Sequence, residues 1–264
     1  MTLSELSALE SQVNALAAEV AAFQRAELTT FDKADVEHKG LNDLVSYVDR
    51  QSEEMLVARL QQLLPDAGFI TEEGTIVRHD KPFMWIIDPL DGTTNFTHGL
   101  PFFAISIALM EADTLLLGVV YEANRCECFS AIKGGGARLN GRSIGVSKVD
   151  SLEKSLLATG FPYYAFDKMP KYLEVLAGFM QQSQGMRRIG SAALDLAYVA
   201  CGRFEGYFEY NLNSYDVAAG ALLVLEAGGT VSDFKGGHNY VFGREILAAS
   251  KGVHTQMLSE VSRI

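Results

Sequence analysis

The chain is short of cysteine, has no long apolar run and lacks extended basic stretches, and each shortage excludes a class of protein. Its three cysteines are an odd number, which argues against a secreted disulfide framework and favours a reducing compartment. The longest apolar run, residues 102–110, is far below the ~20 residues that a membrane-spanning helix needs. Acidic Glu5 stands where a signal peptide requires basic residues. We therefore expect a cytoplasmic protein with no membrane partner.

Negative charge prevails in the composition. The chain has 33 acidic and 22 basic residues, which give a formal net charge of −11. Nucleic-acid-binding surfaces normally carry clustered Lys and Arg, whereas the longest basic run here is the pair Arg187-Arg188. We therefore expect no nucleic acid as primary partner, although a small anion can still bind where metal ions or backbone N–H groups reverse the local sign.

Cysteine and histidine form no metal-binding pattern. Cys126 and Cys128 lack the second Cys or His pair that would complete a zinc site, and the five histidines show no ligand spacing. A Gly-x-Ser-x-Gly nucleophile motif is also absent. Zinc and serine-hydrolase mechanisms therefore have no support in the sequence.

The 264 residues, 48% of them hydrophobic, are enough for a sizeable core. We expect a single domain over residues 1–264, with two subdomains meeting near residues 145–155 as the alternative. Apolar periodicity and turn residues predict helices at 2–23, 44–64, 168–182, 191–201, 217–227 and the C-terminus, and strands at 69–71, 83–87, 102–109, 115–121, 126–132, 186–189, 206–210, 229–231 and 246–249. This mixture predicts an α+β or layered α/β fold.

The most informative segment is Trp85 to Phe96. Its apolar start predicts a buried strand, and its Asp-Pro and Asp-Gly pairs predict a turn. Asp88, Asp91 and the carbonyl of Leu90 can converge on one point, and hard oxygen ligands suit Mg²⁺. The N–H groups of Gly92 and Thr93 would bind a phosphate if a helix starts there. A plain turn, in which both aspartates accept hydrogen bonds from backbone groups, is the alternative.

Other acidic residues have an ordinary and a functional interpretation. Glu72 and Glu73 are adjacent after a short strand, so only one of them is expected to face a given site. Asp49 follows an apolar stretch, and Asp216 stands where a helix begins, so it could simply be an N-cap. Spacing alone does not join these residues into one site.

A resemblance joins them. The segment from Trp85 to Phe96 resembles the inositol monophosphatase family, whose signature is Asp-Pro-hydrophobic-Asp-Gly-Thr-x-Asn after a Trp-bearing strand. The similarity continues, in the order of the family, through Lys39–Asp49, Phe69–Gly74, Gly190–Ala192, Asp216–Gly220 and Glu226–Gly229. It implies a five-layer αβαβα sandwich and Mg²⁺-dependent hydrolysis of a small-molecule phosphate monoester. It also implies sensitivity to lithium and a homodimer.

The same resemblance implies a role for each site residue and two or three Mg²⁺ ions per active site. The first ion would be held by Glu72, Asp88 and the Leu90 carbonyl, and the second by Asp88, Asp91 and Asp216. Glu73 would act in the outer shell, and Glu72 would also help to place a third ion. Thr93 and Asp49 would orient the attacking water. The substrate hydroxyls would be bound by Asp91, Ser191, Ala192 and Glu209.

The physiological substrate stays open among three phosphate esters. Inositol 1-phosphate ranks first, histidinol phosphate is a rival because Glu209 would attract its amine, and a 3′-phosphoadenosine nucleotide ranks lower because Glu209 would repel its second phosphate. Tyr215 stands where the family usually has Trp, which weakens the substrate assignment. A different class of function, an interaction protein of the transcription machinery with secondary catalysis, is the further alternative.

Overall fold

The structure is a computed structural model that describes residues 1–31, 37–40, 43–76, 81–162 and 166–264. The stretch similar to the family at 39–49 therefore includes residues 41 and 42, which lie outside the described residues. A small antiparallel pair, β1 (Glu37–Gly40) and β2 (Asp43–Val45), precedes the main sheets. Among the described residues no helix is long and apolar enough to cross a membrane.

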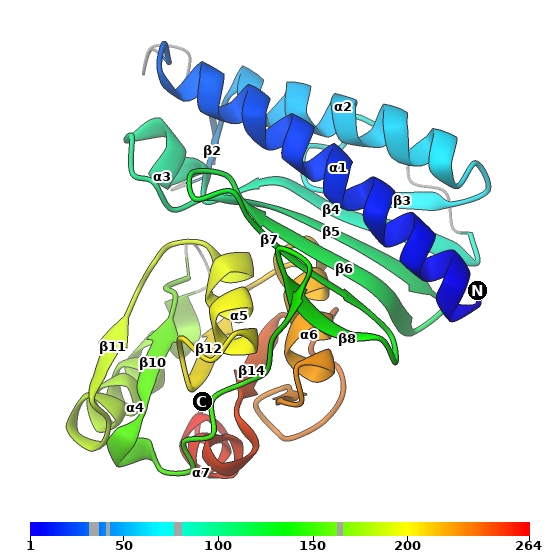
Figure 1. The fold of residues 1–264 in the computed structure, drawn as a ribbon. Helices are drawn as coiled ribbons and strands as arrows, with labels where there is room; N and C mark the ends of the chain where they lie inside the picture. Colours follow the sequence, from blue (N-terminus) through cyan, green and yellow to red (C-terminus); the bar gives the residue numbers. More distant parts are fainter. Residues whose placement is uncertain (32–36, 41–42, 77–80, 163–165) are drawn as a thin grey trace.

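The first large sheet has seven strands in the order β3-β4-β5-β6-β7-β8-β9. Its strands are β3 (Gly68–Thr71), β4 (Phe83–Asp91), β5 (Ala104–Glu111), β6 (Thr114–Glu122), β7 (Glu127–Ile132), β8 (Gly136–Leu139) and β9 (Arg142–Ser143). Only β3 and β4 pair in parallel, and the other neighbours are antiparallel. One face carries the two long helices α1 (Leu3–Leu28) and α2 (Tyr47–Leu63) (Figure 1).

The second sheet has five strands in the order β11-β10-β12-β14-β13. Its strands are β10 (Leu156–Thr159), β11 (Gly185–Arg187), β12 (Gly206–Tyr210), β13 (Thr230–Ser232) and β14 (Glu245–Ala249). Two 3₁₀ turns, η2 (Leu152–Lys154) and η3 (Phe166–Lys168), and the helix α3 (Thr93–Thr97) complete the short elements.

The elements stack as five alternating layers. Helices α5 (Ala192–Ala200) and α6 (Ser214–Glu226) lie between the two sheets, and α4 (Met169–Gln182) and α7 (Lys251–Val261) cover the outer face of the second sheet (Figure 1). The predicted αβαβα sandwich is confirmed. The first sheet ends at Ser143 and the second begins at Leu156, but whether the chain is one domain or two subdomains stays a prediction.

Side-chain alternation along the strands builds a separate core on each face of a sheet. On β4, Ile86 joins the core between the sheets, whereas Trp85 and Ile87 point to the other face and join the core under α1 and α2. A third core beneath α4 and α7 includes Phe208 of β12 and Phe179. Each core is therefore built from side chains of a sheet and of the helices that cover it. This packing holds the strands and helices in fixed positions relative to one another.

The first helix shows how the sequence specifies an element. Thr2 and Glu5 form a capping box, with the Glu5 N–H donating to the Thr2 hydroxyl at 3.3 Å. Near the end of the helix, Phe23 is partly buried and packs against the core, whereas the polar Gln24 is completely buried. The reason is polar: the Gln24 amide nitrogen donates to the Pro89 carbonyl at 2.7 Å, so the helix binds the end of β4 directly.

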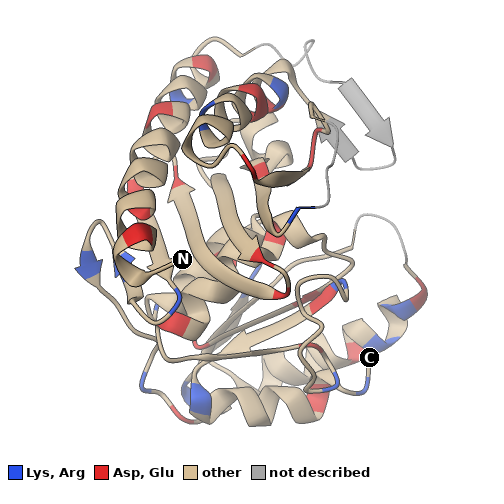
Figure 2. Ribbon diagram, turned by 90° about the vertical axis from the view of Figure 1, so that its right-hand side faces the viewer, with Lys and Arg blue, Asp and Glu red and all other residues tan. Residues whose placement is uncertain are grey.

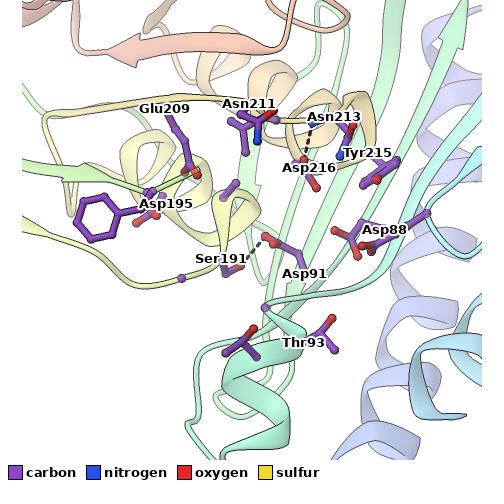
Figure 3. A pocket seen from close by; sticks show the side chains of 18 of the residues that line it. Asp88, Asp91, Thr93, Ser191, Asp195, Glu209, Asn211, Asn213, Tyr215 and Asp216 are labelled. Atoms are coloured by element: carbon purple, nitrogen blue, oxygen red, sulfur yellow. Dashed lines mark hydrogen bonds between the residues drawn. The ribbon is translucent and has the colours of Figure 1, made fainter. Parts of the chain in front are cut away.

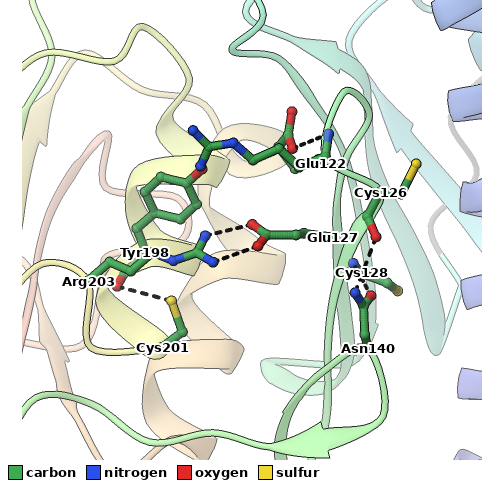
Figure 4. Close-up of polar contacts among 9 residues, drawn as sticks. Glu122, Cys126, Glu127, Cys128, Asn140, Tyr198, Cys201 and Arg203 are labelled. Carbon is green, nitrogen blue, oxygen red and sulfur yellow. Dashed lines mark hydrogen bonds and ion pairs between the residues drawn. The ribbon is translucent and has the colours of Figure 1, made fainter.

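Polar contacts tie the first sheet to the central helices. The Arg203 guanidinium donates two hydrogen bonds, each 2.6 Å long, to Glu127 at the start of β7 (Figure 4), and Arg125 donates to the Tyr198 hydroxyl at 2.9 Å. The three cysteines, Cys126, Cys128 and Cys201, are free thiols. Charged residues of both signs are interspersed over the helices (Figure 2).

Several element boundaries differ from the prediction, and three of them lie next to aspartates that the sequence singled out. The strand expected to end at Ile87 continues to Asp91, because an irregularity in the ladder accommodates Pro89. The second helix begins at Tyr47 after the N-cap Ser46, and the helix expected from 217 begins at Ser214 after the N-cap Asn213.

Candidate active site

One cleft gathers most of the residues that the sequence singled out. It is lined by Glu72, Asp88, Leu90, Asp91, Gly92, Thr93, Ser191, Ala192, Glu209 and Asp216, together with residues the prediction did not include. Figure 3 shows the carboxylates of Asp88, Asp91 and Asp216 near one another and that of Glu209 at the other end of the cleft. Asp49 and Glu73, which the sequence also singled out, are not among the residues that line the cleft.

The end of β4 places two of these aspartates. Asp88 pairs with Ser106 and Asp91 with Ala104, so β4 has one residue more than β5 over this stretch. Proline, which cannot donate to the ladder, fits at such a bulge. The Leu90 N–H donates to the Asp88 carboxylate at 2.9 Å, which fixes the side chain of Asp88 relative to the bulge.

The glycine that follows Asp91 is required by its position. Gly92 has φ of +101°, and a Cβ there would lie 2.9 Å from the Phe102 carbonyl oxygen. The chain turns at Gly92 and α3 begins at Thr93, so the helix start anticipated for phosphate binding is present. The phosphate-binding role of Gly92 and Thr93 stays a prediction.

Asp49 and Thr93 form a hydrogen-bonded pair. The Thr93 hydroxyl lies 2.9 Å from one Asp49 oxygen and 3.1 Å from the Leu90 carbonyl oxygen. The other Asp49 oxygen accepts hydrogen bonds from the Ser46 N–H and hydroxyl at 2.8 and 2.6 Å. Asp49 is fully buried, and burial raises the pKa of this carboxyl. It is therefore held in one orientation, with Thr93 between it and the cleft.

Asp91 joins the first sheet to the central helices. Its carboxylate accepts hydrogen bonds from the Ser191 hydroxyl at 2.6 Å and from the Ala193 N–H at 2.7 Å (Figure 3). A second tie runs from the Asn95 amide to the carbonyls of Phe102 and Ile189, at 2.6 and 3.0 Å. The start of α5 is thereby held against the end of β4.

The segment after β3 is held by a buried carboxylate of α2. Glu53 accepts hydrogen bonds from the N–H of Glu73 at 2.7 Å and from the N–H and hydroxyl of Thr75 at 2.8 Å each. Glu72 lines the cleft whereas Glu73 does not, as the alternation of an extended chain predicts.

Asp216 is not an N-cap. It is the third residue of α6, and its carboxylate accepts a hydrogen bond from the N–H of the N-cap Asn213 at 2.6 Å. The capping box explains its local fold, yet Asp216 also lines the cleft. The ordinary and the functional interpretation are therefore compatible.

The four cleft carboxylates disfavour one another's charge. Burial raises the pKa of Asp88 well above its ordinary value, and Glu72, Asp91 and Asp216 raise it further. Burial and then Asp216 raise the pKa of Glu72, and burial raises the pKa of Asp91 to about 6 although the Ser191 and Ala193 hydrogen bonds oppose this. Such a concentration of negative charge in a buried place needs protons or a cation.

The donor set fits a hard divalent cation. It consists of carboxylate and carbonyl oxygens, the ligands that Mg²⁺ prefers. In the described part of the chain no three Asp, Glu, His or Cys side chains already stand together as a metal site, and the negative charge of Glu72 raises the pKa of Asp88. Mg²⁺ would offset this repulsion.

Glu209 closes the other end of the cleft. Its carboxylate accepts a hydrogen bond from the Tyr207 hydroxyl at 2.6 Å, and burial raises its pKa to about 7. A Cβ on Gly160 would lie 1.9 Å from a Glu209 oxygen. The position of the Glu209 carboxylate therefore requires a residue without a side chain at position 160.

Sequence reasoning missed three buried polar residues around the cleft, namely Gln24, Glu53 and Asp195. Each is a polar residue at a position where the helix pattern calls for an apolar one, and each is at most 1% exposed. A polar residue at an apolar position of a helix is the feature of the sequence that could have indicated these buried contacts.

Comparison with known proteins identifies the family. A sequence model of the inositol monophosphatase family matches residues 4–264. The chain belongs to the inositol monophosphatase family. It is 44% identical over 233 residues to a Nus factor SuhB of Escherichia coli K12, covering 88% of this chain and 87% of that protein. Like other members, it is therefore part of a phosphatase superfamily.

Two solved structures of family members resemble the whole chain. The extragenic suppressor protein suhB from Bartonella henselae has a TM-score of 0.91 at 38% identity, over 96% of this chain and 98% of that one. A Thermotoga maritima IMPase has a TM-score of 0.86 at 33% identity, over 95% of each chain. The family assignment and the fold predicted from the resemblance are thus confirmed.

Proposed function

We propose that this protein is a Mg²⁺-dependent phosphate monoester hydrolase whose preferred substrate is inositol 1-phosphate. The observation that carries the proposal is the group of carboxylates Glu72, Asp88, Asp91 and Asp216 on one cleft. Glu72, Asp88 and the Leu90 carbonyl would hold one ion, and Asp88, Asp91 and Asp216 a second. Bound Mg²⁺ supplies charge neutralisation for the phosphate oxygens and lowers the pKa of water.

The chain itself orients the nucleophile. Because the Thr93 hydroxyl donates to Asp49, its oxygen can take a proton from a water in the cleft as its own proton passes to the Asp49 carboxylate. Asp49 is a good acceptor for this purpose because burial raises its pKa. Gly92 and Thr93, at the start of α3, are proposed to bind the phosphate. Glu73 is proposed to act in the outer shell of the metal site, next to Glu72.

Substrate preference would come from the other end of the cleft. Ser191, Ala192 and Asp91 lie between the carboxylate group and Glu209, and Glu209 is proposed to accept hydrogen bonds from ring hydroxyls. Histidinol phosphate remains the rival, since its amine would also be attracted. A 3′-phosphoadenosine nucleotide ranks lower because its second phosphate would meet Glu209.

A phosphate-release panel tests the proposal. The purified protein is assayed with inositol 1-phosphate, histidinol phosphate, a 3′-phosphoadenosine nucleotide and a generic ester, with Mg²⁺ and with a chelator. We expect Mg²⁺-dependent release, fastest from inositol 1-phosphate, and a selective loss on that ester in Glu209→Gln. Release that persists with chelator would defeat the metal assignment, and preference for histidinol phosphate would select the rival.

A second candidate function follows from the name of the relatives. Several relatives with about 44% identity, including that of Escherichia coli K12, are called Nus factor SuhB, so an interaction with transcription machinery is proposed as an addition to catalysis. A pull-down from native extract tests it, and an Asp88→Asn protein that still captures the same partners would separate it from catalysis. Analytical ultracentrifugation tests the homodimer that the family implies.

A further inference from the structure

Asp195 is a charged residue inside an apolar helix. Its neighbours from Ala192 to Ala200 on α5 are otherwise apolar or aromatic, and Asp195 is only 1% exposed. It also lines the cleft. Figure 3 shows its carboxylate beside that of Glu209, at the opposite end of the cleft from Asp88. The residue therefore lies where the leaving group of a phosphate ester bound at the carboxylate group would extend.

One oxygen of Asp195 is unsatisfied. Oδ1 is buried and has no hydrogen-bond partner among the described residues. The neighbouring carboxylates differ, because Asp91 accepts from Ser191 and Ala193 and Glu209 accepts from Tyr207. Leaving a buried acceptor unpaired costs stability. A carboxylate kept at such a cost, on the wall of a cleft, suits a group that gains its partner from a ligand.

The charges around Asp195 favour an uncharged partner. Burial, and then Glu209 and Asp91, raise the pKa of Asp195 well above its ordinary value, whereas Arg188 lowers it. Burial raises the pKa of Glu209 to about 7, and Arg188 opposes this rise. The Arg188 guanidinium therefore offsets part of the negative charge of the two carboxyl groups. A hydroxyl group gains from an acceptor oxygen alone, whereas an ammonium group gains most from net negative charge, which Arg188 reduces here.

We propose that Asp195 is a specificity-determining residue whose Oδ1 accepts a hydrogen bond from a hydroxyl of the leaving group, next to the hydroxyl bound by Glu209. The inference rests on the proposed function and narrows its substrate class to phosphate esters of polyols that carry neighbouring hydroxyls. An ester without these hydroxyls would leave Oδ1 unpaired and gain nothing from Asp195.

The test compares Asp195→Leu with Asp195→Asn on inositol 1-phosphate and on p-nitrophenyl phosphate. Leucine removes the acceptor and is tolerated among apolar neighbours, while asparagine keeps one acceptor oxygen. We expect kcat/KM of Asp195→Leu on inositol 1-phosphate to fall about 10- to 150-fold, the effect of a hydrogen bond to a charged group. The fall should be smaller in Asp195→Asn, and p-nitrophenyl phosphate should change less than about twofold.

Thermal melting distinguishes binding from a structural role. Because Asp195 is unsatisfied in the free protein, Tm of Asp195→Leu should be unchanged or higher. A lower Tm with equal losses on both substrates would make Asp195 structural, and unchanged kinetics on inositol 1-phosphate would show that it does not touch the leaving group. A larger loss on histidinol phosphate would overturn the hydroxyl assignment. Failure of the wild type to hydrolyse either ester with Mg²⁺ would instead defeat the proposed function.

Discussion

Substitution of Glu53 by glutamine tests whether α2 positions a proposed metal ligand. Glu53 is fully buried and accepts hydrogen bonds from the Glu73 N–H at 2.7 Å and from two Thr75 donors at 2.8 Å. Glutamine has nearly the same shape but keeps one acceptor oxygen. Its NH₂ group must therefore face either the N–H of Glu73 or the donors of Thr75.

The expected cost follows from these contacts. A buried donor left without a partner costs about 1–3 kcal/mol, so we expect the free energy of unfolding to fall by about 2 kcal/mol. For a chain of this size that lowers Tm by roughly 4–8 °C. Because the loosened segment also carries Glu72, the Mg²⁺ concentration for half-maximal phosphate release should rise several-fold.

Glu54→Gln is the matched control. Glu54 is the next residue along the chain but is exposed, and its substitution removes the same charge without touching the segment after β3. Melting curves and Mg²⁺ titrations of both variants give the answer. If Glu53→Gln melts and responds to Mg²⁺ as Glu54→Gln does, the contacts of Glu53 do not position Glu72, and the reasoning is refuted.

Four further predictions concern the cleft. Asp88→Asn should lower phosphate release by roughly 10³-fold or more, because Asp88 is the proposed ligand of both ions. The same substitution should raise Tm in chelator, because it removes the repulsion between Asp88 and Glu72. Near-normal turnover would contradict the two-metal assignment. Gly160→Ala should displace the Glu209 carboxylate, which lies 1.9 Å from the added Cβ, and raise KM for inositol 1-phosphate without affecting a generic ester. Millimolar Li⁺ should inhibit uncompetitively in steady-state assays, and insensitivity would show that the second metal site differs. In chelator, the wild type should lose roughly 3 kcal/mol more stability than Glu209→Gln between pH 4.5 and about 7, because the folded chain binds the Glu209 proton more tightly than the unfolded chain. Urea titrations of the two proteins measure this difference.

Local pattern was sufficient for most elements but not for their ends. The continuous apolar run before Asp88 predicts a buried strand, yet Pro89 suggests its end, and only pairing with β5 shows that the strand continues to Asp91. Strand β10 was not predicted, because Leu156–Thr159 is four residues long and shows no alternation of polar and apolar residues. Its place in the sheet depends on β11 and β12, which are distant in sequence.

The candidate site shows the same limit. The resemblance to the family predicted most of the residues that line the cleft. It did not predict the buried residues whose hydrogen bonds position the segments that carry them. Gln24 reaches the Pro89 carbonyl across 65 positions of sequence, and Glu53 reaches Glu73 from another helix. A polar residue within an apolar stripe signals a buried contact, but the partner becomes known only when the chain folds.

The layers of the fold separate most of the proposed metal ligands from the proposed substrate-binding residue Glu209. Asp88 and Asp91 are fixed by the bulge of β4 in the first sheet, whereas Glu209 belongs to β12 in the second sheet, and the central helices contribute Asp216 and Asp195 to the two ends of the cleft. Substitutions in β12 or at Gly160 therefore act on the leaving-group end without moving the carboxylate group. Because Asp91 accepts hydrogen bonds from Ser191 and Ala193 at the start of α5, the end of β4 is held against the central helices. If the proposed function is correct, changes in the second sheet should therefore alter substrate preference without displacing the proposed metal ligands.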